Sequence, residues 1–123
     1  MVESTNVFPR EERLRKRREF LRVYARGAKV RTRLFFIYLL ENDLPYSRMG
    51  VTASRKVGKT NIRNRVKRRL REIFRKNKRL IYPPSDLVIN TSALTTKASF
   101  ALLEKEFKKV FRQEGGAQDG CGN

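Results

Sequence analysis

Residues 54–74 read Ser54-Arg55-Lys56-Val57-Gly58-Lys59-Thr60-Asn61-Ile62-Arg63-Asn64-Arg65-Val66-Lys67-Arg68-Arg69-Leu70-Arg71-Glu72-Ile73-Phe74. At about 100° per residue on a helix, the apolar and the basic side chains of this stretch fall on two separate arcs. The apolar arc holds Ile62, Val66, Leu70, Ile73 and Phe74, and the basic arc holds Arg63, Asn64, Lys67, Arg68, Arg71 and Arg75. The pattern predicts an amphipathic helix, capped by Thr60 or Asn61 and running to about Lys78. Its apolar side should pack on a sheet and present a row of cations outward.

The basic side of this helix is unusual because Glu72 is the only acid in residues 54–74. Exposed helices ordinarily mix both signs of charge. A merely solvated basic face and a lipid-binding face are the two alternatives, but lipid binding favours bulky apolar residues beside the charges, and this helix lacks them. Arginine dominates the row, and its planar guanidinium can bind phosphate through two hydrogen bonds and stack on bases. The pattern therefore favours RNA binding.

The charge of the whole chain points the same way. Its 123 residues, enough for one domain, include 30 Lys and Arg against 12 Asp and Glu, a net charge of +18. Residues 10–33 and 55–79 carry 24 of those cations. A field this strong indicates a polyanionic partner: nucleic acid, an acidic membrane surface or an acidic protein. No apolar run approaches the roughly 20 residues that span a bilayer, and the start does not resemble a signal peptide, so we expect a cytoplasmic protein.

Catalysis by the chain itself is not expected. The sequence has no histidine, the commonest general base and metal ligand, and its one cysteine, Cys121, lies in a Gly-rich tail. A stand-alone nuclease would need clustered carboxylates to hold metal, and the acids are scattered. We therefore predict no catalytic residue, no tightly bound metal and no disulfide in this chain.

Outside residues 54–74 the chain alternates helix and strand patterns. We expect a helix over 17–26, ended by Gly27, and a strand over 34–40. A second strand over 48–54 should run antiparallel to the first through the turn at 42–45. A third strand over 86–91 and a helix over 97–112 complete the pattern. The prediction is an α+β fold in α-β-β-α-β-α order, a small, mostly antiparallel sheet packed with three helices.

The domain organisation follows from these elements. We expect an irregular segment over 1–12, one RNA-binding domain over 13–112, and a disordered Gly-rich tail over 113–123. The last helix carries a core stripe of Phe100, Leu103, Phe107, Val110 and Phe111. Core positions are also expected for Phe35, Phe36 and Phe74.

With these residues in view, the chain resembles the bacterial ribonuclease P protein subunit. The run Arg63-Asn64-Arg65, with Lys67-Arg68 and Arg71-Glu72 after it, is similar to the RNR motif of that family. Further blocks match in the same order: Arg13-Leu14-Arg15, Arg18-Glu19-Phe20 through Gly27, residues 33–38 and Arg48-Met49-Gly50-Val51. The resemblance covers residues 13 to about 112. Thr60 stands where the family usually has Ala, a change that suits a helix start.

The resemblance implies a function. The protein subunit of ribonuclease P, an endoribonuclease of tRNA processing, assists removal of the 5′ leader from precursor tRNA. Magnesium ions held mainly by the RNA subunit perform the hydrolysis. No membrane and no obligate protein partner are implied. The resemblance also implies a left-handed βαβ crossover, against the usual right-handed rule.

Two RNA contacts are implied as well. The RNR segment, which should meet the ribonuclease P RNA and in part the substrate, comprises Arg55, Lys56, Lys59, Arg63, Asn64, Arg65, Lys67, Arg68 and Arg71. A cleft between the sheet and the N-terminal helix should bind the single-stranded leader through Phe20, Tyr24 and Tyr38, because unpaired bases stack on aromatic rings. From the residues alone, core packing is the more common role for such aromatics, since a helical i, i+4 pair and a strand tyrosine are more often core than ligand platform. Arg65 and Arg69 both point partly sideways on the helical wheel; Arg65 is kept for its place in the motif, and Arg69 is ranked lower.

Other functions stay open from the residues alone. A ribosomal or RNA-packaging protein would be just as small and basic, and would differ in its RNA partner. A DNA-binding protein would need a recognition helix. Asn64 could contact base edges, but no preceding helix and turn completes that motif.

Overall fold

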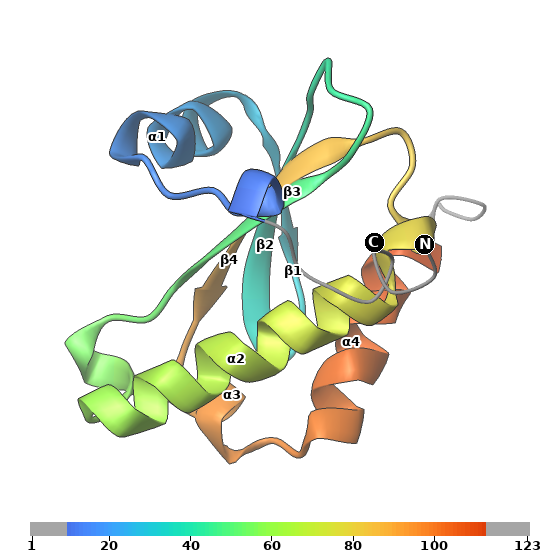
Figure 1. The fold of residues 1–123 in the computed structure, drawn as a ribbon. Helices are drawn as coiled ribbons and strands as arrows, with labels where there is room; N and C mark the ends of the chain where they lie inside the picture. Colours follow the sequence, from blue (N-terminus) through green and yellow to red (C-terminus); the bar gives the residue numbers. More distant parts are fainter. Residues whose placement is uncertain (1–9, 113–123) are drawn as a thin grey trace.

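The computed structural model describes residues 10–112 (Figure 1). The elements, in chain order, are a 3-10 turn η2 (Arg10–Glu12), α1 (Arg17–Arg26), β1 (Ala28–Arg31), β2 (Phe35–Glu41), β3 (Arg48–Thr52), a 3-10 turn η3 (Arg55–Val57), α2 (Thr60–Lys76), a 3-10 turn η4 (Lys78–Leu80), β4 (Ser85–Thr91), α3 (Ala93–Lys97) and α4 (Phe100–Arg112). The predicted α+β class is confirmed. Residues 10–12, expected to be irregular, form η2. The expected Gly-rich tail with Cys121 lies outside the described residues.

The four strands form one mixed sheet in the order β1-β2-β4-β3. Strands β1 and β2 pair antiparallel, as do β2 and β4, whereas β3 and β4 run parallel. The predicted β2–β3 hairpin is therefore wrong, since β4 lies between those two strands. The burial of β4 explains this placement. Its residues 85–89 are all buried, as expected for a central strand covered on both faces.

The two faces of the sheet carry different layers. Alternate side chains of a strand point to opposite faces, and on one face Ile37, Leu87 and Ile89 pack with Leu70 of α2 and Phe107 of α4 in the main core. The other face carries a smaller core of Leu14, Val23 and Val88 under α1. Figure 1 shows α1 well separated from α2, α3 and α4, which lie together. The sheet thus holds the basic helix on one side and α1 on the other.

Helix α2 follows the predicted pattern closely. Val66, Leu70, Ile73 and Phe74 are buried and Ile62 is half-buried. The cap prediction was wrong: Lys59 occupies the N-cap and makes no side-chain cap bond, so Thr60 is the first helical residue. Gly58, at φ 154°, makes the sharp entry into the helix, a backbone conformation that is essentially reserved for glycine.

Two further elements were not predicted. Strand β1 is a short, basic edge strand, and α3 is a separate helix of five residues that precedes α4. Chain segments β3-α2-β4 form a βαβ unit, because β3 and β4 are parallel and α2 connects them. The left hand of this crossover stays a prediction.

Candidate nucleic-acid interface

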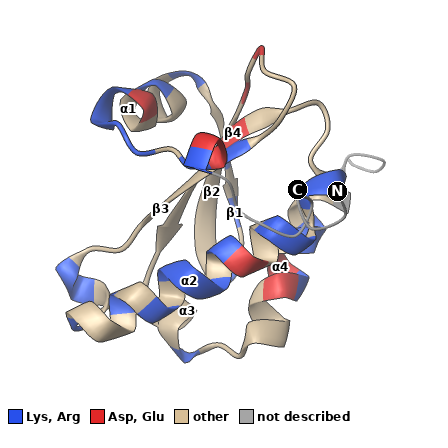
Figure 2. Ribbon diagram, in the orientation of Figure 1, with Lys and Arg blue, Asp and Glu red and all other residues tan. Residues whose placement is uncertain are grey.

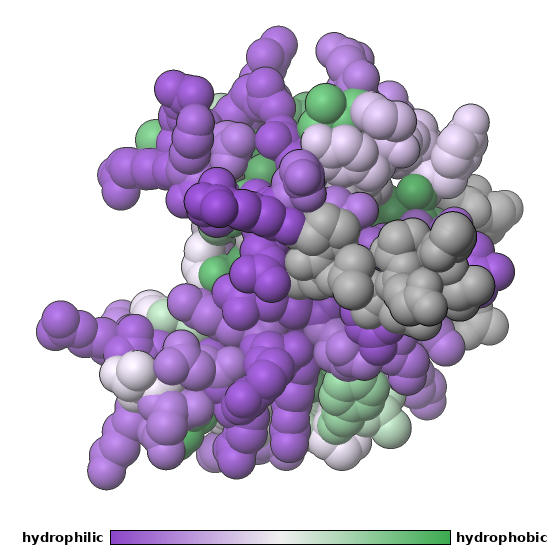
Figure 3. Space-filling model, viewed as in Figure 1, coloured by the Kyte–Doolittle hydropathy of each residue, from purple (hydrophilic) through white to green (hydrophobic). Residues whose placement is uncertain are grey.

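Basic residues are concentrated along η3 and α2 (Figure 2). We call the nine predicted residues the RNR face: Arg55, Lys56, Lys59, Arg63, Asn64, Arg65, Lys67, Arg68 and Arg71. Six of them are exposed, namely Arg55, Lys56, Lys59, Asn64, Arg65 and Arg68, and the other three are half-buried. Figure 3 shows that the surface over α1 and α2 is largely hydrophilic. The structure therefore places the predicted RNA-binding residues on α2 and on the short segment that leads into it.

Neighbouring arginines of α2 differ in what they contact. Arg63 donates a hydrogen bond from Nη2 to the Thr60 hydroxyl, at 3.1 Å, within the first turn of its own helix. Arg69 instead donates to the backbone carbonyl of Ala98, at 3.3 Å, and so ties α2 to the segment between α3 and α4. This contact supports the lower rank of Arg69 as an RNA ligand. Arg68, which precedes Arg69 in the sequence, is exposed.

Arg71 lies near a second cation from another part of the chain. Burial lowers the pKa of Arg71, and the nearby charge of Arg13 lowers it further. The Leu14 amide holds this N-terminal segment along β3, where it donates to the Met49 carbonyl at 3.0 Å. Arginine remains protonated at neutral pH even when its pKa falls. A phosphate bound near both guanidinium groups would offset their repulsion.

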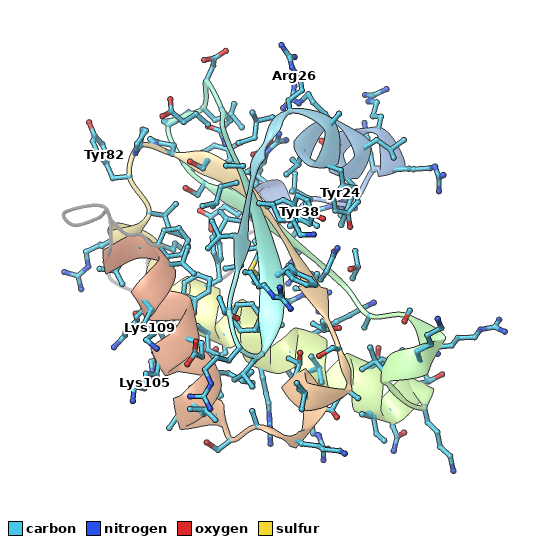
Figure 4. All side chains as sticks on the ribbon, turned by 180° about the vertical axis from the view of Figure 1, so that it is seen from behind. Tyr24, Arg26, Tyr38, Tyr82, Lys105 and Lys109 are labelled. Carbon is cyan, nitrogen blue, oxygen red and sulfur yellow. The ribbon has the colours of Figure 1, made fainter. Side chains whose placement is uncertain are left out.

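Four half-buried rings lie on the opposite side of the sheet, and we call them the aromatic surface: Phe20, Tyr24, Phe36 and Tyr38. Tyr24 of α1 and Tyr38 of β2 meet edge to face, with ring centroids 4.8 Å apart and an interplanar angle of 82° (Figure 4). The Tyr24 hydroxyl donates to Asn90 Oδ1 of β4 at 2.8 Å. The rings are thus held partly by the core and leave area for stacking.

Phe20 reaches the sheet because Gly50 leaves room for it. A Cβ atom at position 50 would collide with the Phe20 ring and would also approach the Leu14 Cβ at 3.1 Å. Gly50 lies on β3, directly opposite Val88 of β4. The glycine therefore fixes how closely this ring of α1 approaches the sheet.

Phe36 was predicted to lie in the core, and that prediction is wrong. Phe35 points into the main core, so its neighbour Phe36 points to the face that carries α1. Lys29 Nζ lies 4.5 Å from the centroid of the Phe36 ring, and the Arg31 guanidinium carbon lies 5.8 Å from it. The period-two alternation of β2 would have identified Phe36 as a partner of Tyr38.

A buried carboxylate holds α1 against this face. The side chain of Asp86 on β4 is fully buried and accepts hydrogen bonds from Arg22 of α1 at 3.2 Å and from Asn42 at 2.8 Å. Arg48 also donates to Asp86, and to Glu19 of α1 at 3.2 Å. Burial would raise the pKa of Asp86, but the hydrogen bonds and charges of these partners outweigh it and hold that pKa below its ordinary value.

Residues 10–112 contain neither a metal-ion cluster nor a membrane-spanning helix. No group of three or more Cys, Asp or Glu side chains in this part of the chain could hold a metal ion. Among the same residues, no helix is long and apolar enough to cross a bilayer.

Comparison with known proteins decides the family. The family model described as Ribonuclease P matches residues 8–115. The chain belongs to the ribonuclease P protein family. The ribonuclease P protein component of Syntrophus aciditrophicus is 37% identical over 105 residues, which cover 85% of this chain and 88% of that protein. That of Thermotoga maritima is 44% identical over 85 residues, which cover 69% and 73%.

Solved structures of the family share this fold. The ribonuclease P protein from Thermotoga maritima superposes with a TM-score of 0.75 at 31% identity, covering 89% of this chain and 99% of that one. The Staphylococcus aureus protein gives a TM-score of 0.74 at 26% identity, covering 82% and 93%. The predicted family is confirmed. The individual roles of the RNR face and the aromatic surface stay predictions.

Proposed function

We propose that this chain is the protein subunit of a ribonuclease P ribonucleoprotein and assists endonucleolytic removal of the 5′ leader from precursor tRNA in the cytoplasm. One observation supports this function above all. The RNR face and the aromatic surface belong to opposite sides of one sheet, so a single rigid body can contact two RNA elements at once. The names of the relatives, ribonuclease P protein component, support the same assignment.

The RNR face binds the ribonuclease P RNA in this proposal. A row of guanidinium groups along α2 is suited to contacts with the phosphate backbone of a folded RNA. Such contacts position the RNA and do not read its base sequence. Each neutralised phosphate releases counterions, so binding weakens steeply with salt. The aromatic surface binds the leader, since single-stranded bases stack on rings with little sequence preference.

The hydrolysis itself belongs to the RNA subunit, with magnesium as its cofactor. The sequence supports this division because it has no histidine to act as a general base. The contribution of the chain is binding and orientation of the substrate, which can supply a large share of a rate enhancement.

Reconstitution tests this function. The full chain is added to a bacterial ribonuclease P RNA and a 5′-extended precursor tRNA at low magnesium, and release of the leader is followed against RNA alone and protein alone. We expect strong stimulation over RNA alone and no cleavage by protein alone. Binding of the RNA without stimulation would favour a ribosomal or packaging role. Cleavage by protein alone would overturn the assignment of the chemistry to RNA.

A further inference from the structure

Basic residues continue from the aromatic surface to the edge of the sheet. Lys29 Nζ lies 5.8 Å from the centroid of the Tyr38 ring, in addition to its closer contact with Phe36. Lys29 and Arg31 both lie on β1, the edge strand, opposite Tyr38 and Phe36 in the antiparallel register. Cations therefore border the rings on the side where the sheet ends.

A small hollow lies beyond this edge, between the β1–β2 connection and α4. Its volume is about 200 Å³, and its lining is Val30, Arg31, Thr32, Arg33, Glu106, Lys109 and Val110. Arg31 contributes both to this hollow and to the border of the Phe36 ring. The aromatic surface and the hollow therefore share one residue, Arg31, at the edge of the sheet. We call the cations of this path the edge strip: Lys29, Arg31, Arg33 and Lys109.

The lining of the hollow combines charged and apolar residues. Arg31, Arg33 and Lys109 are exposed, and Val30 and Val110 are half-buried. Glu106 is the one acid of the lining, and its buried carboxylate pairs with Lys109 at 3.5 Å. That pair neutralises one cation and holds Lys109 at the rim, while the strip as a whole remains positive. Lys105 is exposed on the same helix, and Figure 4 shows it close to Lys109.

Cations on an edge strand also have a simpler use, because they discourage edge-to-edge pairing of sheets. That use accounts for Lys29 and Arg31, which lie on β1. It does not account for Arg33, which follows the strand, or for Lys109, which belongs to α4. Residues of β1, of the β1–β2 connection and of α4 all line the hollow. Protection of a strand edge does not need cations from outside the strand, whereas a groove that binds an RNA backbone does.

We propose that single-stranded RNA leaving the aromatic surface crosses the edge of β1 and enters this hollow, where the edge strip binds the backbone of the more distal leader nucleotides. The proposal rests on the proposed function and extends it. It predicts recognition of phosphate and sugar without base preference, because the hollow is lined by charged donors and two valines rather than by a base-reading arrangement. Leader length thereby becomes a determinant of affinity.

The test compares two precursor tRNAs that differ only in leader length, about 4 and about 12 nucleotides, within the range of single-strand sites on small folds. Equilibrium binding is measured with the holoenzyme reconstituted from the full chain and a bacterial ribonuclease P RNA. The variants are Arg33→Ala and Lys109→Ala. We expect each to weaken binding of the long-leader substrate by about threefold to fivefold, as for an exposed ion pair, and to leave the short-leader substrate unchanged.

Lys108→Ala is the matched control. Lys108 is the neighbouring lysine of α4, but it lines a different pocket with Lys76 and Arg79. Lys108→Ala should therefore not weaken binding of the long-leader substrate more than binding of the short-leader substrate. Thermal unfolding is recorded for every variant, because Lys109→Ala leaves the buried Glu106 without its partner. Arg33→Ala removes an exposed side chain and tests the proposal even where Lys109→Ala is destabilised.

The outcomes separate this inference from the proposed function. Equal weakening for both leaders would place the edge strip against the RNA subunit or the tRNA body and overturn the inference. Unchanged binding of both substrates would also overturn the inference, and would leave prevention of edge-to-edge sheet pairing as the role of the edge strip. In both cases the proposed function stands if the unmodified chain still stimulates cleavage. Failure of that stimulation would overturn the proposed function itself.

Discussion

Arg48 of β3 donates two hydrogen bonds to the Asp86 carboxylate of β4, from Nε to Oδ1 at 2.9 Å and from Nη2 to Oδ2 at 2.7 Å. The two residues are directly opposite in the parallel register. Such two-pronged pairs are among the strongest hydrogen-bonded contacts in proteins. Because Arg22 and Asn42 donate to the same buried carboxylate, one side chain joins β3, β4, α1 and the β2–β3 connection.

Replacement of this carboxylate should therefore be costly. Asp86→Asn keeps the size of the side chain but removes the buried charge that Arg48 and Arg22 bind, and leaves Arg48 with only its ion pair to Glu19 among the described contacts. We expect a loss of about 3 kcal/mol of unfolding free energy, as for other broken buried pairs. Urea unfolding measures it. Arg22→Ala serves as the control, because the Arg22 side chain is 48% exposed. An equal loss in that variant would contradict the central role of the Arg48–Asp86 pair.

The same residue should make stability depend on pH in the acid range. A carboxyl whose pKa is lower in the folded chain binds fewer protons there, so unfolding free energy rises with pH. The stability from Asp86 is present above its ordinary pKa of 3.8 and is lost as the pH falls through the lower folded value. Unfolding measured from about pH 5 downward should show a steeper decline for the natural chain than for Asp86→Asn. Parallel curves would mean that other carboxyls, such as Glu19, dominate.

Because Gly50 leaves room for the Phe20 ring, we expect the stability effects of substitutions at these two positions to depend on each other. Gly50→Ala should cost about 1–3 kcal/mol of stability, because the added methyl group forces the Phe20 ring away from the sheet. In a Phe20→Ala background the same substitution should cost much less, since the obstructing ring is gone. A double-mutant cycle by chemical unfolding gives the coupling. Additive costs would show that Gly50 is needed for another reason.

Loss of a ring from the aromatic surface should affect only substrates with a leader. Tyr38→Ala removes a stacking platform worth about 1–3 kcal/mol per base, so the holoenzyme should bind precursor tRNA more weakly and mature tRNA unchanged. Tyr24→Phe is the companion variant, because it keeps its ring and loses only the bond to Asn90. It should bind precursor tRNA nearly as well as the natural chain. Equal weakening of mature tRNA by Tyr38→Ala would contradict a leader-binding role.

Two adjacent arginines of α2 should behave differently. Arg68→Ala should weaken binding to the ribonuclease P RNA and reduce its salt dependence by about one phosphate contact. Arg69→Ala should mainly lower thermal stability, because Arg69 bonds to the Ala98 carbonyl. Binding titrations at several salt concentrations, with melting curves, separate the two. An unchanged salt slope for Arg68→Ala would show that this side chain does not reach phosphate.

Local patterns predicted most of the elements, because helix periodicity and apolar runs are local properties. They identified α1, α2, β2 and β4 and the core stripe of α4. They missed β1, whose four residues carry two cations and no apolar run, as an edge strand often does. The wrong β2–β3 hairpin had another cause. A short connection favours pairing of the two strands that it joins, but here β4 pairs with both β2 and β3 and separates them.

The candidate site was predictable in part. The helical wheel predicted the basic arc of α2, and the resemblance added the remaining residues of the RNR face. Tyr24 and Tyr38 are in contact, and their role in leader binding stays a prediction. The network around Asp86 was not predicted, since its donors come from residues 22, 42 and 48 and depend on the tertiary arrangement. The sequence-based assignment of Phe36 to the core ignored the strand alternation.

Strand β4, to which both β2 and β3 are bonded, is also the last strand of residues 10–112 to be synthesised. A nascent chain that ends before Ser85 already carries the whole basic helix, yet lacks the strand that joins β2 to β3 and supplies Asp86. Its early cations would meet cellular RNA as a flexible polycation, which binds without selectivity. Completion of β4 supplies the strand between β2 and β3, and α4, which follows it, supplies Phe107 to the main core. We therefore expect the ordered surface to form late in translation, after both elements have been added.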